Sequence, residues 1–275
     1  MNSAQKPWLS AYPEGVPAEI DTTAYSSLVD LMQESFRKYG DRTAFSFLGK
    51  GLSYKELDRL SQVFAAYLQS LGLVFGDRVA IMLPNVLQYP IAVAAVLRAG
   101  FVVVNINPLY TARELEAQLK DSDAKAIVVL ENFGATLQEC LARTPVKHVV
   151  LCAMGDRLGW LKGMLVNHVV RKVKKMVPVF ELPKAVRFND ALSQGELCTL
   201  TSPEIHGDDL AVLQYTGGTT GVAKGAELLH RNVMANMLQA SAWFQPALKC
   251  IPSNEIPTFI CPLPLYHIFA FTLNI

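Results

Sequence analysis

The strongest constraint on the fold is a repeated alternation of apolar runs and amphipathic segments between residues 78 and 152. Four runs rich in valine and isoleucine predict buried strands, at residues 78–83, 101–106, 125–130 and 147–152. Segments with helical spacing lie between them and predict helices at residues 86–99, 112–120 and 133–142. Buried strands joined by helices are typical of a parallel sheet with helices on both faces. The pattern therefore predicts an α/β fold with a doubly wound, mostly parallel sheet.

The residues that precede this alternation predict two more helices of the same domain. Apolar side chains follow helical spacing over residues 28–39. Ser53 and Glu56 have the spacing of a capping box, and the helix that they begin ends at Gly72. Residues 1–24 hold several prolines and glycines and predict a loose surface arm.

Composition and charge exclude several classes of protein. The net charge of +1 argues against a nucleic-acid binder, which is normally basic. The five cysteines are scattered without Cys-x-x-Cys spacing and predict reduced core thiols of a cytosolic protein, not a zinc site. The N-terminus lacks the apolar core of a signal peptide, and Pro90, Arg98 and Gly100 interrupt the most apolar region. We therefore expect a soluble, cytoplasmic chain.

Residues 153–209 break the alternation, and an inserted segment at 160–180 carries five basic residues and no acidic one. Its valines share helical spacing opposite part of this charge; they are Val166, Val169, Val170, Val173 and Val177. Such a basic amphipathic helix can rest on an anionic membrane surface, here the inner face of the membrane. A solvated helix packed on the protein body by its valines gives the same pattern. The sequence leaves both interpretations open.

A second feature combines a predicted strand at residues 210–215 with a loop of phosphate-binding composition. The loop residues that carry this chemistry are Thr216, Gly217, Gly218, Thr219, Thr220, Gly221 and Lys224. Glycines let backbone N–H groups approach a ligand closely, threonine hydroxyls can donate to phosphate or face magnesium, and lysine adds positive charge. This composition suits a polyanion. Residues 225–229 can return as a second strand, which places the loop at a hairpin turn.

Two common nucleotide-binding templates do not fit this loop. A Walker A loop needs adjacent Gly and Lys followed by Ser or Thr, but Ala223 precedes Lys224 and Gly225 follows it. The glycines also lack the Gly-x-Gly-x-x-Gly spacing of a dinucleotide site. A plain surface loop is the other interpretation of a glycine cluster. Three threonines, three glycines and a lysine directly after a buried strand favour the phosphate site.

The string YTGGTTGVAKG at residues 215–225 closely resembles the phosphate loop of the adenylate-forming superfamily. This superfamily includes acyl-coenzyme A ligases, luciferases and the adenylation domains of peptide synthetases. The string is most similar to that of bacterial long-chain fatty acid coenzyme A ligases. Ala223 stands where the superfamily commonly has proline, but the change removes no phosphate-binding group. GDRVAIMLPN at 76–85 and NPLYTAREL at 107–115 also resemble the family, so the resemblance runs from about residue 40 onward.

The stretch PLPLYHIFAF at residues 262–271 resembles a second motif of the same superfamily, and the residues before it, 258–261, are strand-like. The resemblance implies that His267 orients the reacting carboxylate or the adenylate phosphate. It also implies that Phe271 lines the mouth of an acyl tunnel. His230 starts another predicted helix, and we interpret it as a helix-start or packing residue. The residues of that helix expected to face inward are Val233, Met237, Ala240 and Phe244.

The resemblance implies a ligase reaction in fatty acid metabolism, including β-oxidation. A fatty acid carboxylate reacts with ATP to give an acyl-adenylate and pyrophosphate, and coenzyme A then displaces AMP to form a thioester. Lys224 and His267 would act in catalysis, and Thr216 would help to hold Mg²⁺. The residues implied in binding ATP are Tyr215, Thr216, Gly217, Gly218, Thr219, Thr220, Gly221 and Lys224.

On this basis we divide the chain into an arm at 1–24, a first α/β subdomain at 25–205 and the start of an ATP-binding subdomain at 206–275. The family's acidic magnesium motif, ribose-binding aspartate and C-terminal catalytic lysine have no counterpart here, so we expect an incomplete N-terminal large domain without turnover of its own. Two alternatives stay open. One is an adenylating ligase for a medium-chain, aryl or amino acid, and the other is a non-catalytic nucleotide- or membrane-binding fragment. Acyl chain length and a homodimer are not decided by the sequence.

Overall fold

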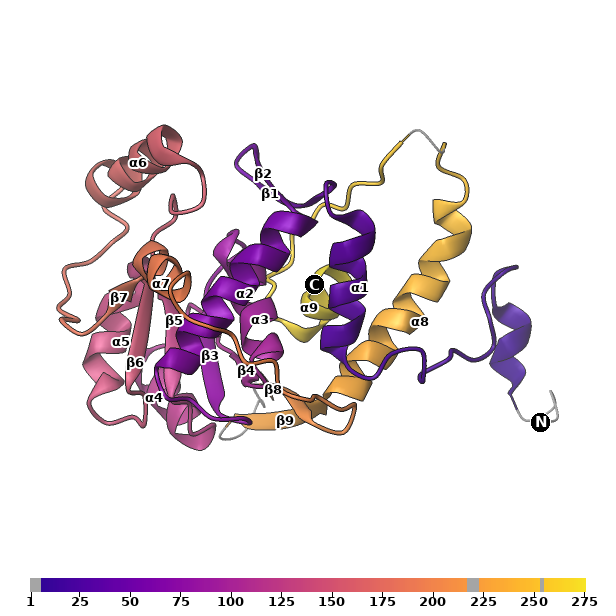
Figure 1. Ribbon diagram of the computed structural model, residues 1–275, viewed down its shortest axis with the longest axis horizontal. Helices are drawn as coiled ribbons and strands as arrows, with labels where there is room; N and C mark the ends of the chain where they lie inside the picture. The colour runs from indigo at the N-terminus through magenta and orange to yellow at the C-terminus, as the bar shows by residue number, and fades with distance from the viewer. Residues whose placement is uncertain (1–5, 217–222, 253–254) are drawn as a thin grey trace.

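The computed structural model describes residues 6–216, 223–252 and 255–275 (Figure 1). Its main sheet has seven strands among the described residues, in the order β7-β6-β5-β3-β4-β8-β9. The predicted strands appear as β3 (Arg78–Met82), β4 (Val102–Asn105), β5 (Ala126–Leu130) and β6 (His148–Cys152), all paired in parallel. The sheet continues through β7 (Val186–Arg187) at one end and through β8 (Leu210–Thr216) and β9 (Lys224–Leu229) at the other. Only β9 is antiparallel, so the prediction of a mostly parallel sheet is confirmed.

Helices cover both faces of this sheet, as the doubly wound prediction requires. One face carries α1 (Leu28–Tyr39), α2 (Tyr54–Ser70), α3 (Gln88–Arg98) and α7 (Phe188–Gly195), and the other carries α4 (Ala112–Asp121) and α5 (Gly134–Leu141). Alternate side chains of β3 enter different cores: Val79 and Ile81 pack toward α3, and Ala80 and Met82 pack toward α4. Burial on both faces explains why this strand is continuously apolar.

The predicted capping box at the start of α2 forms only in part. The Ser53 hydroxyl accepts a hydrogen bond from the Glu56 backbone N–H at 3.1 Å. The Glu56 carboxylate accepts instead from Arg157, at 3.1 Å, and so ties α2 to the loop after β6. The spacing therefore predicted the helix start correctly, but not the partner of the carboxylate.

A two-stranded hairpin before α2 was not predicted. It consists of β1 (Thr43–Phe47) and β2 (Lys50–Ser53), joined through Leu48 and Gly49. Both turn residues have positive φ, 48° and 73°, as a two-residue hairpin turn of the primed type requires. Leucine is unusual in this conformation, so the sequence lacks the Asn-Gly signal that normally marks such a turn.

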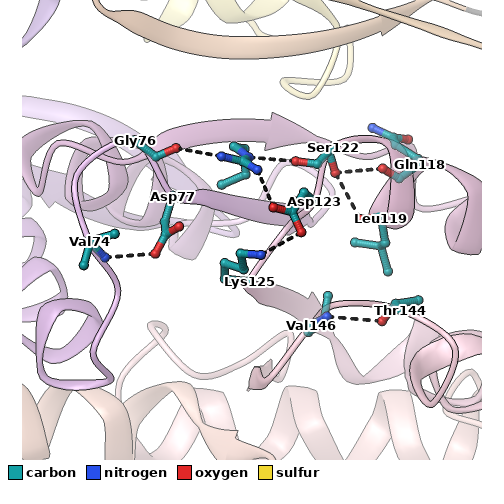
Figure 2. Close-up of polar contacts among 11 residues, drawn as sticks. Val74, Gly76, Asp77, Gln118, Leu119, Ser122, Asp123, Lys125, Thr144 and Val146 are labelled. Carbon is teal, nitrogen blue, oxygen red and sulfur yellow. Dashed lines mark hydrogen bonds and ion pairs between the residues drawn. The ribbon is translucent and has the colours of Figure 1, made fainter.

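A polar cluster joins the amino ends of β3 and β5 (Figure 2). Arg78 donates to the Asp123 carboxylate at 2.6 Å and to the Ser122 carbonyl at 2.8 Å, and Lys125 also donates to Asp123 at 2.6 Å. The hydrogen bond from Lys125 is the main cause that lowers the pKa of Asp123. The three charged side chains are partly exposed, so the cluster fixes loop positions more than it adds stability. It lies at the sheet edge opposite the carboxyl ends of the strands.

The basic insertion is helical over a shorter range than predicted. It consists of α6 (Trp160–His168) and a π-helical turn, Val169–Val173. Of the five valines that share helical spacing, Val170 is buried, whereas Val173 is 63% exposed. A π-helical turn holds more residues than an α-turn, so it shifts the face on which later side chains fall. The five valines therefore do not form one uniform buried face.

A buried carboxylate anchors this insertion to the sheet. Glu131 follows β5 and is only 2% exposed. Arg171 donates to its two oxygens at 2.8 Å each, and Arg187 donates to one of them at 2.8 Å. A buried carboxylate requires such partners because an unpaired charge is strongly unfavourable away from water. Lys162 donates to the Leu48 carbonyl, and Lys172, Lys174 and Lys175 face solvent.

The last part of the described chain holds α8 (His230–Leu248) and α9 (Ile268–Asn274). Val233 is buried as predicted, but Phe244 is exposed and contacts the ring of Phe259 edge-on. Residues 258–261 are not a strand, because they extend along the surface without pairing to the sheet. None of the described helices combines the length and the apolar character needed to cross a bilayer.

We predict that Gly195→Ala destabilises the protein by about 1–3 kcal/mol, the usual range for overpacking. A Cβ at this position of α7 would lie 2.2 Å from the backbone oxygen of Val63 in α2, so one helix must move. The clash outweighs the helix propensity that alanine adds, about 1 kcal/mol. Urea unfolding measures the change. Gly207→Ala is the control, because its Cβ would have no neighbour closer than 3.4 Å; equal stabilities of the two variants would contradict the prediction.

Candidate active site

The β8–β9 hairpin places two of the predicted phosphate-binding residues opposite each other. Thr216 ends β8, Lys224 begins β9, and the two are paired across the ladder. Side chains of directly opposed residues project to the same face of a sheet, so the hydroxyl and the ammonium group lie together. Both residues are exposed. The candidates between them, Gly217, Gly218, Thr219, Thr220 and Gly221, lie outside the described residues.

Tyr215 fixes this hairpin to the body of the protein. Its side chain is 8% exposed, and its hydroxyl donates to the Asp121 carboxylate at the end of α4, at 2.6 Å. Burial, reinforced by Asp121, raises the pKa of this hydroxyl. Its strand partner is Gly225, where a Cβ would come within 3.0 Å of the tyrosine ring. The glycine therefore leaves room for the ring, and the ring holds the base of the loop in place.

Gln214 connects the same strand to the second motif. Its side-chain amide donates to the Tyr266 carbonyl oxygen at 3.3 Å. Side chains two residues apart on a strand point to the same face, so Thr216 faces the side on which Tyr266 lies. The two motifs, which are far apart in the sequence, thus meet on one face at the carboxyl edge of the sheet. Ligands of open α/β sheets bind at this edge.

His267 and Phe271 occupy different environments. The His267 side chain is exposed, and the residue precedes the first turn of α9. Its backbone N–H donates to the Pro264 carbonyl at 3.0 Å. Phe271 is fully buried and belongs to the core that packs against α3. The structure therefore presents His267 to solvent, and it holds Phe271 beneath the surface of the described chain.

Two further site residues were not singled out by the sequence analysis. Asn85, which follows β3, forms hydrogen bonds through its side chain to Cys261, Leu263 and Leu265. Tyr89 in α3 reaches the Leu265 carbonyl oxygen with its hydroxyl, at 2.8 Å. The only signal in the sequence was the stretch at 76–85, which resembles the family and ends in Asn85.

His230 is buried at the first residue of α8, in agreement with its interpretation as a packing residue. It is 2% exposed, and its Nδ1 has no hydrogen-bond partner among the described residues. Burial lowers the pKa of the imidazole to about 4, so the ring is neutral near pH 7. A group so enclosed has no access to a substrate at the loop.

No cluster of three or more His, Cys, Asp or Glu side chains suited to a metal occurs in the described part of the chain. Magnesium prefers oxygen ligands, keeps several waters and takes substrate phosphates as ligands. The Thr216 hydroxyl is an oxygen ligand and fits this chemistry as a single contact to such an ion. The cysteines are only partly core thiols as expected: Cys140 and Cys152 are buried, but Cys250 is exposed.

Comparison with known proteins identifies the family of the chain. Residues 32–275 match the family model described as AMP-binding enzyme. The chain belongs to the AMP-binding enzyme family. It is 51% identical to a long-chain-fatty-acid–CoA ligase of Escherichia coli O157:H7 over 98% of this chain and 48% of that protein. It is 34% identical to one of Bacillus subtilis over 98% of this chain and 47% of that protein. The chain thus spans about half the length of the curated relatives it matches.

Solved structures of this family share the fold. A long-chain-fatty-acid-CoA ligase from Archaeoglobus fulgidus superposes with a TM-score of 0.71 at 24% identity, covering 95% of this chain and 46% of that one. The adenylation domain of a carboxylate reductase from Mycobacterium chelonae gives 0.66 at 19% identity, covering 99% and 44%. The predicted fold class and the resemblance to adenylate-forming ligases are confirmed.

We predict that His230 makes the protein less stable in acid. The folded pKa of about 4 lies below the ordinary value of 6.5, so the unfolded state binds more protons between these values. The contribution is complete above pH 6.5 and is lost as the pH falls from 6.5 toward 4. His230→Phe should flatten the free energy of unfolding over this range. Urea unfolding at a series of pH values tests this, with His168→Gln, at an exposed site, as the control. Identical pH profiles of His230→Phe and the unmodified protein would refute the assignment.

Proposed function

We propose that the full-length protein is an AMP-forming long-chain fatty acid coenzyme A ligase. The observation that carries the proposal is the pairing of Thr216 with Lys224 at the carboxyl edge of the sheet, where Gln214 of the same strand contacts the segment before His267. Family membership and the 51% identity to a named ligase support it. The substrates are ATP, a fatty acid and coenzyme A.

The reaction has two displacements. A carboxylate oxygen attacks the α-phosphorus of ATP, the α–β phosphoanhydride bond breaks, and pyrophosphate leaves with the bonding electrons. The thiolate of coenzyme A then attacks the acyl carbonyl carbon, and AMP leaves. A free carboxylate is a poor electrophile at carbon, and the adenylate provides the leaving group that it lacks. Two steps of moderate difficulty replace one that is very slow.

Residues of the β8–β9 loop stabilise the charge that develops on pyrophosphate. Thr216 and Lys224 stand at its two ends, and Gly217, Gly218, Thr219, Thr220 and Gly221 supply backbone and hydroxyl donors between them. Donors fixed before the reaction stabilise a developing charge without reorganising. Tyr215 contributes by holding the first strand of the loop through Asp121. Bound Mg²⁺ would neutralise phosphate charge, and the Thr216 hydroxyl would be one of its oxygen contacts.

His267 and Phe271 serve the acyl side of the site. His267, exposed before α9, orients the carboxylate or the adenylate phosphate with an imidazole N–H. Phe271, one helical turn later, backs the start of the acyl path from within the core. An exposed donor beside a buried aromatic suits a substrate with a charged head and an apolar chain.

Carboxylate-dependent ATP–pyrophosphate exchange tests the proposal on the full-length protein. Long-chain fatty acids should give the highest rate over a panel that includes medium-chain, aryl and amino acids. A preference for one of those other acids would support the adenylation reaction but identify a different carboxylic acid as the substrate. Absence of exchange with every acid, although ATP binds, would overturn the enzymatic function.

We predict that Lys224→Ala lowers the exchange rate by about 10- to 1,000-fold, as loss of one preorganised donor does in other enzymes. The lysine pairs with Thr216 across the β8–β9 ladder, so its charge would lie near pyrophosphate bound at this hairpin. Lys249→Ala, an exposed lysine at the end of α8, is the control and should leave the rate unchanged. An unaltered exchange rate in Lys224→Ala would show that Lys224 has no role in the reaction.

Peripheral contact of the insertion with the cytoplasmic face of the membrane is the second part of the proposal. One face of α6 exposes large apolar side chains; they are Trp160, Leu161, Met164 and Leu165. Three exposed lysines follow α6 later in the same insertion; they are Lys172, Lys174 and Lys175. Arg171 is held by Glu131, so the segment has a fixed attachment to the body. Apolar groups beside lysines suit the boundary between acyl chains and anionic headgroups.

We predict that replacing Lys174 and Lys175 by Gln weakens binding to vesicles rich in phosphatidylglycerol by roughly 10- to 30-fold, because each basic residue contributes about 1 kcal/mol at such a surface. Co-sedimentation of the protein with these vesicles measures the effect. The same change at Lys147 and Lys249, two exposed lysines elsewhere, should leave binding unaltered. Equal binding of all three proteins, or no binding at all, would refute the membrane contact.

A further inference from the structure

We propose that Tyr89 and Asn85 are positioning residues that set the location of His267 in the active site. The inference rests on the proposed function, because it gives these residues a role that acts through His267. It is carried by hydrogen bonds that reach from the sheet and α3 to the irregular segment 261–266. These contacts end one residue before His267.

Asn85 holds the first part of this segment. Its amide nitrogen donates to the Cys261 carbonyl at 3.1 Å and to the Leu263 carbonyl at 2.9 Å. Its amide oxygen accepts from the Leu265 backbone N–H at 2.8 Å. Because an amide nitrogen only donates and an amide oxygen only accepts, these three contacts are compatible with one orientation of the Asn85 side-chain amide. One side chain therefore fastens three backbone positions of a segment that has no regular structure of its own.

Tyr89 holds the last part of the segment 261–266 from within the core. It is completely buried, and its hydroxyl lies 2.8 Å from the Leu265 carbonyl oxygen and 2.7 Å from Oδ1 of Asn105. Burial raises the pKa of this hydroxyl well above its ordinary value, so it keeps its proton as a donor. Leu265 and Asn105 are also buried. The hydroxyl has a single proton for their two acceptor oxygens, so its removal would take away the donor that these oxygens share.

Gln214 extends these contacts to the phosphate loop. It donates to the Tyr266 carbonyl at 3.3 Å, and its oxygen lies 3.4 Å from the amide nitrogen of Asn105. Two residues later the same strand ends at Thr216. The carbonyls of residues 265 and 266 are thus held by side chains of α3 and β8, respectively.

The arrangement explains how an exposed histidine can have a defined position. The His267 side chain faces solvent, so packing does not fix it. Its backbone is fixed instead, by the two anchored carbonyls before it and by α9 after it. Catalysis is sensitive to such placement, because a shift of about 1 Å can cost on the order of 100-fold in rate. A merely structural tyrosine would change stability without acting through His267.

Tyr89→Phe removes only the hydroxyl and is the first variant to test. In the full-length protein we expect the kcat of fatty-acid-dependent pyrophosphate exchange to fall about 10-fold or more, with the KM for ATP changed less than about twofold. Tyr67→Phe is the matched control, because Tyr67 is buried in the same core and has no described bond to the segment 261–266. An unchanged kcat in Tyr89→Phe would overturn the proposal.

A double-mutant cycle with His267→Ala decides whether the effect passes through His267. Tyr89→Phe should lower kcat in the unmodified protein and have no further effect in the His267→Ala background. Asn85→Ala, at a half-buried site, should behave in the same way, and it provides the test if Tyr89→Phe does not fold. If Tyr89→Phe lowered kcat by the same factor in both backgrounds, the positioning role would be overturned. Full activity of His267→Ala alone would instead refute the role that the proposed function assigns to His267. That failure is distinguishable from equal losses in the two backgrounds.

Discussion

Parallel pairing of β3, β4 and β8 is the constraint on which the site depends, because it brings the carboxyl ends of all three strands to one edge of the sheet. Asn85 follows the first strand, Asn105 ends the second, and Gln214 and Thr216 lie at the end of the third. Both faces of these strands are covered, so Asn105 and Gln214 are buried and Asn85 is half-buried, whereas Thr216 at the end of β8 is exposed. Buried amides and hydroxyls must find partners, and here they find them in one another and in the segment before His267.

The segment at 261–266 depends on these side chains because it belongs to no helix or strand. Its carbonyls cannot be satisfied by a ladder, and Asn85, Tyr89 and Gln214 provide the hydrogen bonds that regular structure would give. The hairpin of the phosphate loop is fixed in a different way, through Tyr215 and Asp121 on the opposite face. Two independent attachments thus hold the two motifs against the same sheet.

Much of this fold follows from sequence pattern, because continuous apolar runs and helical spacing report burial directly. The strands from Arg78 to Cys152 and their helices lie within a few residues of the predicted positions. The β1–β2 hairpin was missed because Leu48 adopts the conformation that usually requires glycine or asparagine. The strand expected at 258–261 is absent because these residues lie on the surface without pairing to the sheet, with Phe259 in contact with Phe244 of α8. Apolar character alone does not separate these two outcomes.

The candidate site also contains some residues that the sequence indicates and others that it does not. Thr216 and Lys224 could be found from residue type and spacing, since phosphate binding needs hydroxyls, glycines and a cation within a short stretch. Asn85 and Tyr89 could not be found in this way, because their partners lie 176 to 180 residues later in the chain. Only the topology brings them together. The π-helical turn in the insertion is a further example, because it changes which side chains face solvent without any clear mark in the sequence.

The most direct test of the account follows the carboxylate oxygen. A fatty acid labelled with ¹⁸O in its carboxylate would be converted by the full-length protein with ATP and coenzyme A, and the products would be analysed by mass spectrometry. Attack at the α-phosphorus transfers one carboxylate oxygen to the phosphate of AMP, so the account predicts one ¹⁸O in AMP and none in pyrophosphate. Label in inorganic phosphate, with ADP as the other product, would contradict it, because the acid would then have been activated at the γ-phosphorus.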